Sequence, residues 1–362
     1  MCPMRICIVY NAHPTGCSFY RLEMPNAAVS DNYPEFDFVS VENIGTISDE
    51  QLQTIDLFLF NRTWVQGTIE QVQKVHKALT SNGAKIILDM DDYWELGTGH
   101  IYYQMYLKNK TPDMIRETIR LADHVTCTTE HLAAYVRKLN DQVTILPNIP
   151  YEPYKQFTPV PELEMEKELV KFGWFGGAQH TEDIEMLYDS MGKLEGDKEL
   201  DGRYKLYLGG WNDNNPVYTE YERIFRFNGR NPNYGRMQAA DIYSYVGGYN
   251  FVNVALAPLR DTLFNGLKSE LKIIEAGWMG KAMICSEKAP YTDVVRHMEN
   301  AVVIPYNKNK SGWYKAIRML INEPETRHAL ASQLSQDVRK QFDIVETTKR
   351  RAELYRKLGN RG

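Results

Sequence analysis

The 362-residue sequence has no long apolar run that could cross a membrane. A membrane-spanning helix needs roughly 20 consecutive apolar residues, and no stretch approaches that length. The first residues, Met1-Cys2-Pro3-Met4-Arg5, lead into a strand-like run and not into the apolar core of a signal peptide. We therefore expect a soluble, cytoplasmic protein with no transmembrane segment.

The sequence also has few cysteines and a small net charge. The five cysteines are scattered and never form a Cys-x-x-Cys pair, which argues against a disulfide framework and against a zinc site. A formal net charge of -5 gives no general reason to expect nucleic acid or an anionic membrane as partner, although Lys349-Arg350-Arg351 forms a local basic run. No G-x-G-x-x-G follows a strand with an acidic residue about 20 positions later, so an NAD-dependent oxidoreductase is disfavoured.

Short apolar runs alternate along the chain with segments in which apolar residues recur at helical spacing. This alternation predicts an α/β fold. Hydrophobic residues at 43% and charged residues at 25% are typical of a folded protein, and the length favours two domains. In the first half, Ile69, Val72, Val75 and Leu79 recur at helical spacing, as do apolar residues in 114–122 and 131–139. Parallel strands covered by helices on both faces are expected at residues 5–10, 36–41, 56–60, 85–88, 124–128 and 143–146.

A proline-rich segment at residues 149–161 separates this half from a second α/β pattern. Strands are expected there at residues 170–175, 204–208, 251–257, 282–286 and 301–304, with a helix at 181–194. The long helical pattern of residues 325–358 suits an element that packs back across both halves. We therefore expect Rossmann-like, doubly wound domains at residues 1–150 and 151–340, facing a central cleft, and a C-terminal helix at 341–362.

The most specific stretch lies between a strand ending near Ala257 and a strand beginning near Ala282. Lys268, Lys272 and Glu275 are spaced by four and three residues, which places them on one face of a helix. Ser269 is expected to cap that helix, whose free N–H groups and positive dipole end would suit a diphosphate.

These residues resemble the retaining GT-B glycosyltransferases of the glycosyltransferase family 4, or group 1, superfamily, in a divergent bacterial or phage branch. The resemblance rests on Lys268-Ser269-x-x-Lys272-x-x-Glu275-x-Gly277-x-x-Gly280-Lys281. It implies that the helix start receives the donor diphosphate, with Lys272 and Lys268 as catalytic cations, and that Glu275 contacts the ribose. The family often has a second, sugar-facing glutamate eight residues earlier, where this chain has Leu267.

A second match opens the C-terminal half at residues 171–183. Gly176 and Gly177 follow the expected first strand there, and adjacent glycines let the backbone approach a ligand closely. In relatives this turn faces the donor phosphates. His180 follows it, and we expect it to act near the donor. A tight turn capped by Thr181 is the plainer alternative.

A third match lies in the N-terminal half, where Gly16 to Pro25 resembles the glycine turn of these transferases. It places Gly16 and Arg21 near a phosphate or the acceptor, with Tyr20 on the acceptor side, although a basic residue on a first helix is more often solvated. Asp91 and Asp92 end the fourth strand and are expected to shape the acceptor side. Clustered carboxylates can bind magnesium. GT-B relatives need no metal, however, so we expect no metal site.

The resemblance implies a hexosyl- or pentosyltransferase that uses a nucleoside-diphosphate sugar, most readily a UDP- or GDP-sugar, with retention of configuration and no further cofactor. The expected acceptor is a glycan or a lipid-linked glycan, in which case the protein would work at the inner face of a membrane. Two alternatives stay open at this point: a phage-type transferase acting on a modified DNA base, and a non-catalytic two-domain binding protein.

Overall fold

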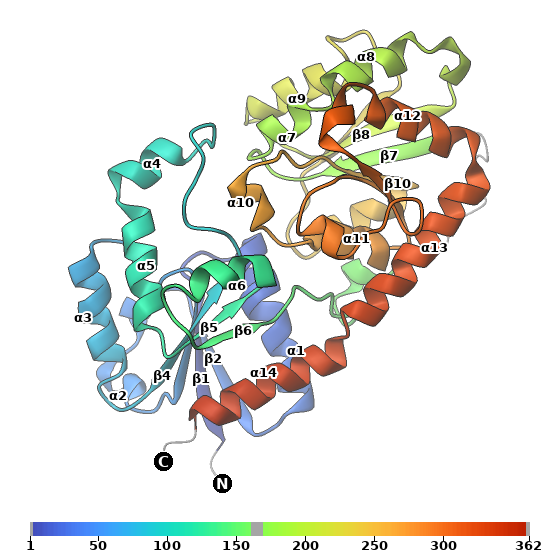
Figure 1. The fold of residues 1–362 in the computed structure, drawn as a ribbon. Helices are drawn as coiled ribbons and strands as arrows, with labels where there is room; N and C mark the ends of the chain where they lie inside the picture. The colour runs from blue at the N-terminus through green and yellow to red at the C-terminus, as the bar shows by residue number, and fades with distance from the viewer. Residues whose placement is uncertain (1–2, 161–168, 360–362) are drawn as a thin grey trace. The chain divides into compact units, whose positions relative to one another are not determined.

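The computed structural model describes residues 3–160 and 169–359, which form two compact units. The first unit comprises Met1–Tyr151, Leu267–Ser269 and Phe342–Gly362, and the second comprises Glu152–Gly266 and Glu270–Gln341. Each unit contains one six-stranded sheet flanked by helices (Figure 1). The α/β fold class with two doubly wound, Rossmann-like units is thus confirmed.

The sheet of the first unit is parallel throughout, with strand order β2-β1-β3-β4-β5-β6. Each predicted strand of this half is present. In β1, four consecutive residues from Ile6 to Val9 are buried, as expected for a strand covered on both faces. The bounds are β1 Met4–Val9, β2 Phe36–Val41, β3 Leu57–Asn61, β4 Lys85–Met90, β5 His124–Cys127 and β6 Val143–Ile145.

Several helices of the first unit begin at a side-chain cap. α3 (Ile69–Leu79) starts at a capping box in which the Thr68 side chain accepts from the Gln71 amide and the Gln71 side chain accepts from the Thr68 amide. The other helices are a π-helix at Ser18–Glu23 that runs into α1 (Met24–Asn32), α2 (Asp49–Leu52), α4 (Tyr103–Lys108), α5 (Thr111–Leu121), α6 (Glu130–Val136) and α14 (Ile344–Gly359).

The sheet of the second unit is also parallel, with strand order β12-β11-β10-β7-β8-β9. The sequence analysis missed β9, an edge strand that is only partly buried and so lacks an apolar run. β10 starts three residues later than predicted, because Tyr245–Phe251 forms a 3₁₀ helix. The bounds are β7 Val170–Phe175, β8 Tyr204–Trp211, β9 Tyr234–Gln238, β10 Val254–Ala257, β11 Ala282–Ser286 and β12 Val302–Ile304.

Two predicted helices of this half are broken. The segment 181–194 forms α7 (Thr181–Glu185) and α8 (Tyr188–Gly196), and the closing pattern forms α13 (Pro324–Gln341) and α14. The second break has a local cause, since the Asp343 side chain accepts from the Val345 and Glu346 amides and so starts a new helix. The remaining helices are α9 (Val217–Phe225), α10 (Leu263–Gly266), α11 (Leu271–Trp278) and α12 (Asn309–Asn322).

α14 belongs to the first unit, where Tyr355 anchors it. The Tyr355 hydroxyl donates to Asn26 Oδ1 at 2.6 Å, and its ring lies 5.8 Å from the ring of Phe36. α13 belongs to the second unit. Of the proline-rich segment, residues 149–160 contain only a 3₁₀ turn at Lys155–Phe157, and Pro161 lies outside the described residues. No helix in the described parts of the chain combines the length and apolar character needed to cross a bilayer.

Candidate active site

Strand order fixes where a ligand would bind in the second unit. β7 lies between β8 and β10, so the direction of strand succession reverses between β7 and β10. In open α/β sheets ligands bind at such a switch point, beyond the carboxyl ends of the strands. The Gly176-Gly177 turn directly follows β7, and α11 carries Lys272 and Glu275 in the same unit.

Lys272 lies against the glycine turn. Its Nζ donates to the Phe175 carbonyl and sits 5.2 Å from the centroid of the Trp174 ring. A Cβ atom added to Gly176 would lie 3.1 Å from this Nζ, whereas one added to Gly177 would meet nothing within 4 Å. The Lys272 ammonium therefore lies beside the backbone of this turn, and the space next to Gly177 is open.

The turn is also held closely from β8. Gly210 has φ of +86°, and a Cβ atom there would come within 2.5 Å of the Gly176 carbonyl oxygen. The Tyr218 hydroxyl donates to the same oxygen at 3.3 Å. The position of Gly176 therefore depends on the absence of a side chain at residue 210.

Gly210→Ala should lower both stability and donor turnover, because the new Cβ must displace the Gly176 backbone. The matched control is Gly202→Ala, which has φ of +72° but nothing within 4 Å of its Cβ. Both variants carry the left-handed penalty of about 1–2 kcal/mol. Gly210→Ala alone should show a further loss of thermal stability and of nucleoside diphosphate release. Equal values for the two variants would contradict the role of the close approach between residue 210 and Gly176.

Two predictions for this segment are wrong in detail. Ser269 does not cap α11, which has Glu270 at its N-cap position and no side-chain cap hydrogen bond. Lys268 precedes the helix, so it does not share a helical face with Lys272. Both residues group with the first unit, where the Ser269 hydroxyl accepts from Asn148 Nδ2 at 3.1 Å.

Glu275 is almost fully buried, although the resemblance predicts that it contacts a ligand. Its side chain is 3% exposed, and its carboxylate accepts from the hydroxyls of Tyr245 and Tyr249, the latter at 3.1 Å. Burial, followed by the neighbouring Glu275 charge, raises the pKa of Tyr249 well above its usual value.

His180 is oriented by a carboxylate that the sequence analysis did not single out. Its Nδ1 lies 2.8 Å from Asp183 Oδ2, and its backbone amide donates to the Tyr221 hydroxyl at 2.8 Å. Asp183 is buried and also accepts from the Arg260 amide and the Asn265 side chain, at 2.7 and 2.9 Å. A carboxylate on one ring nitrogen fixes the tautomer and orientation of an imidazole, so His180 is held at the start of α7 in a defined position.

In the first unit, Arg21 is not where a phosphate could meet it. The side chain is 1% exposed, and Nε and Nη2 each donate to Asp89 at 2.8 Å, while Nη1 donates to Asn148 Oδ1 at 3.0 Å. Arg21 is therefore part of a buried ion pair and not of the ligand site. Tyr20 is buried as well, whereas Gly16 is exposed with open space around it.

Asp91 and Asp92 meet a residue that the sequence analysis missed. Arg62 follows β3 with φ of +63°, and it donates from Nε to Asp91 at 2.6 Å and from Nη2 to Asp92 at 2.7 Å. Burial alone would raise the pKa of the Asp91 carboxyl, but the Arg62 guanidinium holds that pKa well below its usual range. The only sequence signal for Arg62 is its place just after an apolar strand.

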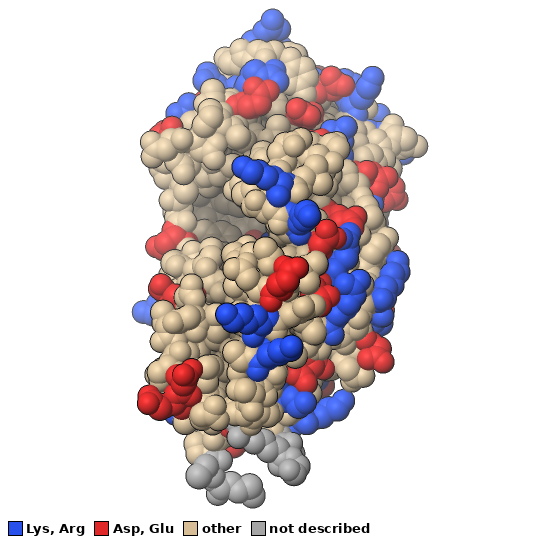
Figure 2. All heavy atoms as spheres, turned by 90° about the vertical axis from the view of Figure 1, so that its left-hand side faces the viewer, with Lys and Arg blue, Asp and Glu red and all other residues tan. Residues whose placement is uncertain are grey.

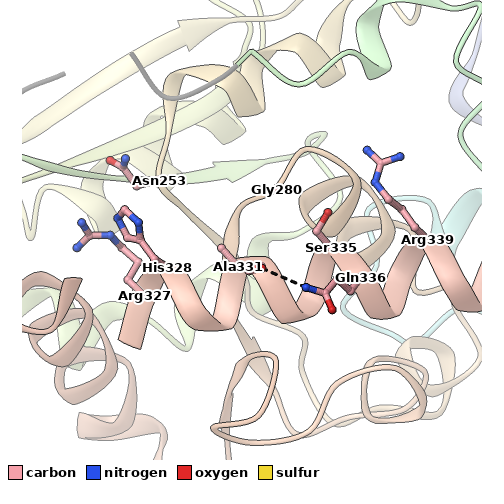
Figure 3. A pocket seen from close by; sticks show the side chains of 9 residues that line it. Asn253, Gly280, Arg327, His328, Ala331, Ser335, Gln336 and Arg339 are labelled. Atoms are coloured by element: carbon pink, nitrogen blue, oxygen red, sulfur yellow. Dashed lines mark hydrogen bonds between the residues drawn. The ribbon is translucent and has the colours of Figure 1, made fainter. Parts of the chain in front are cut away.

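Within residues 3–160 and 169–359, no three His, Cys, Asp or Glu side chains gather as a metal site would require. A pocket of about 430 Å³ lies in the second unit along one face of α13 (Figure 3). Its other wall comes from Asn253 and Gly280, which precede β10 and β11, so it opens at the amino-terminal edge of the sheet. None of the predicted site residues lines it; the lining residues are Asn253, Gly280, Arg327, His328, Ala331, Ser332, Ser335, Gln336 and Arg339.

Solved structures resemble the whole chain. Sucrose-phosphate synthase from Thermosynechococcus elongatus is 16% identical with a TM-score of 0.72, over 98% of this chain and 99% of that one. Anabaena HepE in complex with UDP and glucose is 10% identical with a TM-score of 0.69, over 97% and 99%. A glycosyltransferase from Rickettsia africae ESF-5 is 9% identical with a TM-score of 0.67, over 100% of both chains. The chain has the GT-B fold.

The structural match covers both units, but the sequence identity to these structures is low. Comparison with family models and with curated proteins gives no match. The residues that distinguish this GT-B chain must therefore be judged from their own contacts. In the second unit those contacts place the Lys272 ammonium at the Gly176-Gly177 turn, while the Glu275 carboxylate accepts from two tyrosine hydroxyls and His180 follows the turn after β7.

Proposed function

We propose that the protein is a glycosyltransferase that moves a sugar from a nucleoside-diphosphate sugar to an acceptor hydroxyl, with retention of configuration. The observation that carries the proposal is the contact of Lys272 with the Gly176 turn at the switch point of the second sheet. The GT-B fold supports it, and one structure with this fold was solved with UDP and glucose.

The chemistry follows from where charge develops. When the bond between the anomeric carbon and the β-phosphate oxygen breaks, negative charge builds on the departing diphosphate. The Lys272 ammonium and the backbone amides at Gly176 and Gly177 would stabilise that charge more in the transition state than in the ground state. The departing phosphate can accept the acceptor's proton on the same face, so no strong general base is required.

Release of nucleoside diphosphate tests the proposal directly. Incubation with UDP-, GDP-, CMP- and dTDP-sugars should give slow hydrolysis of one donor without an acceptor, and we expect a UDP- or GDP-sugar. The preferred donor should also raise the unfolding temperature, because a ligand at 100 times its Kd stabilises by about 2.7 kcal/mol. Binding without any release would instead indicate a non-catalytic binding protein.

Glu275 is proposed to hold the donor ribose in place of the Tyr245 hydroxyl. Glu275→Gln should weaken UDP or GDP binding by about ten- to a hundredfold, the value of a hydrogen bond to a charged group. Tyr245→Phe is the matched control, since it removes the competing hydroxyl and should leave binding equal or tighter. Unchanged nucleotide affinity in Glu275→Gln by titration calorimetry would restrict Glu275 to a structural role.

The proposed acceptor is a glycan or a lipid-linked glycan, bound near Arg62, Asp91 and Asp92. Two of these side chains carry negative charge and one carries positive charge, an arrangement that suits neutral hydroxyl groups better than a polyanion. Lys and Arg side chains are intermixed with Asp and Glu on the face drawn in Figure 2. Filter binding to duplex DNA at two salt concentrations checks this choice, because a DNA acceptor would show strong, salt-dependent retention.

A further inference from the structure

The pocket along α13 has no role in the proposed transfer reaction (Figure 3). Its volume of about 430 Å³ lies in the range of about 300–1,000 Å³ that is typical of sites for small molecules. A Cβ atom added to Gly280 would meet nothing within 4 Å, so the space in front of this backbone is open. Ser332 and Gln336 are exposed at its border, so a ligand can enter the pocket from solvent.

The charged side chains that line this pocket are basic. Arg327, His328 and Arg339 contribute to the lining, and none of the lining residues in the described parts of the chain is Asp or Glu. Arg327 is 8% exposed, and its Nη1 donates to the Leu320 carbonyl at 2.6 Å, which holds the guanidinium in place. A guanidinium held in this way presents its donors as a fixed fork that matches the oxygens of a phosphate or a carboxylate.

Side chains with N–H donors gather at one end of the pocket. Figure 3 shows Asn253, Arg327 and His328 at the same end. Asn253 Oδ1 accepts from the Lys171 amide at 2.8 Å, so the Asn253 side chain is held in place from β7. Three donor side chains match the three terminal oxygens of a phosphate monoester better than the two oxygens of a carboxylate.

The remainder of the pocket is lined by small and by neutral polar side chains. Beyond Ala331, Figure 3 shows Ser335 and Gln336 further along α13, and Gln336 Nε2 donates to Ser332 Oγ at 3.3 Å. Hydroxyl and amide groups can exchange hydrogen bonds with the hydroxyl groups of a ligand. Residues 328 and 336 are about 12 Å apart along the helix axis, at 1.5 Å per residue, which leaves room for a body of pentose size beside the phosphate.

α13 packs directly against α11, the helix that carries Lys272. A Cβ atom added to Gly277 of α11 would lie 2.7 Å from Val338 Cγ2 of α13. Arg339 lines the pocket, and its Nη2 donates at 3.0 Å to the carbonyl of Trp278, the last residue of α11. A ligand that moves α13 or Arg339 therefore acts on α11.

We propose that the pocket along α13 binds a small phosphate monoester with a hydroxyl-bearing body, and that its occupancy changes the affinity for the sugar donor. The phosphate would lie at the Arg327 end and the hydroxyl groups at the Ser335 end. The pocket opens at the amino-terminal edge of the sheet, whereas the Gly176-Gly177 turn follows the carboxyl end of β7, so the two ligands would bind at opposite edges. The effect on the donor rests on the proposed function, whereas binding in the pocket does not.

Titration calorimetry of the full chain with ribose 5-phosphate as the probe tests the binding. Inorganic phosphate, ribose and gluconate are titrated separately, and we expect each to bind at least tenfold more weakly than ribose 5-phosphate. Equal affinity for gluconate would overturn the choice of a phosphate, and equal affinity for inorganic phosphate would overturn the role of the hydroxyl groups. No binding of ribose 5-phosphate or of inorganic phosphate would overturn the whole proposal.

Variants on α13 test whether the probe binds in this pocket. Arg327→Gln should weaken ribose 5-phosphate binding by about ten- to a hundredfold, the value of a hydrogen bond to a charged group. Ser332→Trp should fill the pocket and weaken binding at least tenfold. Lys340→Gln is the matched control, because Lys340 is exposed on α13 and is not among the lining residues. If Arg327→Gln fails to fold, Ser332→Trp at an exposed position gives the same test.

Lys272→Ala distinguishes this pocket from the donor site. It should leave the affinity for ribose 5-phosphate unchanged. Loss of binding in Lys272→Ala, with full binding in Ser332→Trp, would place the probe at the glycine turn and overturn the pocket assignment.

The effect on the donor is measured as the affinity for UDP or GDP with and without saturating ribose 5-phosphate. We expect a change of at least fivefold, the lower end of usual coupling between two sites, and no change in Ser332→Trp. Equal nucleotide affinity under both conditions would overturn the coupling. A protein that binds ribose 5-phosphate but no nucleotide would lose the transferase function and the coupling, while the pocket assignment would stand.

Discussion

Replacing Lys272 with alanine should lower nucleoside diphosphate release by about 100- to 1,000-fold, the usual loss when one charge-stabilising donor is removed from an active site. Lys272 Nζ already lies at the Gly176 turn, where it donates to the Phe175 carbonyl. A diphosphate at this turn would compete for the ammonium group, and its growing charge during bond cleavage would favour the contact further. Steady-state kinetics with the preferred donor measure the effect.

The fold should survive this change, because Lys272 is partly exposed and donates to a neutral carbonyl. Lys272→Arg should recover part of the rate, since it restores charge but not the compact ammonium geometry. Lys315→Ala, at an exposed position of α12 in the same unit, serves as the control and should keep full activity. Equal rates for Lys272→Ala and Lys315→Ala would remove Lys272 from the mechanism.

Replacing Arg21 with alanine should destabilise the first unit by about 3–5 kcal/mol, the usual cost of leaving one partner of a buried ion pair without the other. Asp89 is itself buried, and besides Arg21 it accepts from the Thr126 hydroxyl at 2.6 Å. Without the guanidinium, the buried Asp89 carboxylate loses two hydrogen bonds and its countercharge. Urea unfolding followed by circular dichroism measures the loss.

Lys85→Ala gives the comparison, because Lys85 pairs with Asp123 at 2.9 Å on the surface of the same unit. Exposed pairs contribute about 0–1 kcal/mol, so its urea midpoint should barely move. A stable Arg21→Ala variant with lost donor binding would instead restore the phosphate role that the sequence suggested for Arg21.

The alternation of apolar runs predicted the fold well, because a parallel strand covered on both faces must be apolar along its whole length. Eleven strands were found in this way at residues within β1 to β8 and β10 to β12. β9 was not predicted, because an edge strand buries fewer side chains and so lacks an apolar run. Residues 325–358 read as one helical pattern, although the domain boundary was expected at residue 341. The structure places the break there, where α13 ends at Gln341 and the Asp343 side chain accepts from the Val345 amide at the start of α14.

The candidate site was predicted in part. The resemblance to GT-B transferases placed both Lys272 and the glycine turn at the donor phosphates, and the structure brings these two features together. Arg21 could not be assigned, since its partner Asp89 lies 68 residues away and nothing local signals a buried pair. The same holds for Arg62, whose partners follow the next strand. Asp183 has one local partner, His180, but its partners Arg260 and Asn265 lie about 80 residues further along the chain.

The most direct test of the account is a crystal structure of the protein with bound UDP or GDP. The account predicts the diphosphate beyond the carboxyl end of β7, within hydrogen-bonding distance of Lys272 Nζ and the Gly176 and Gly177 amides. A diphosphate bound elsewhere, for example along α13 at Arg327 and Arg339, with Lys272 still donating to the Phe175 carbonyl, would contradict it.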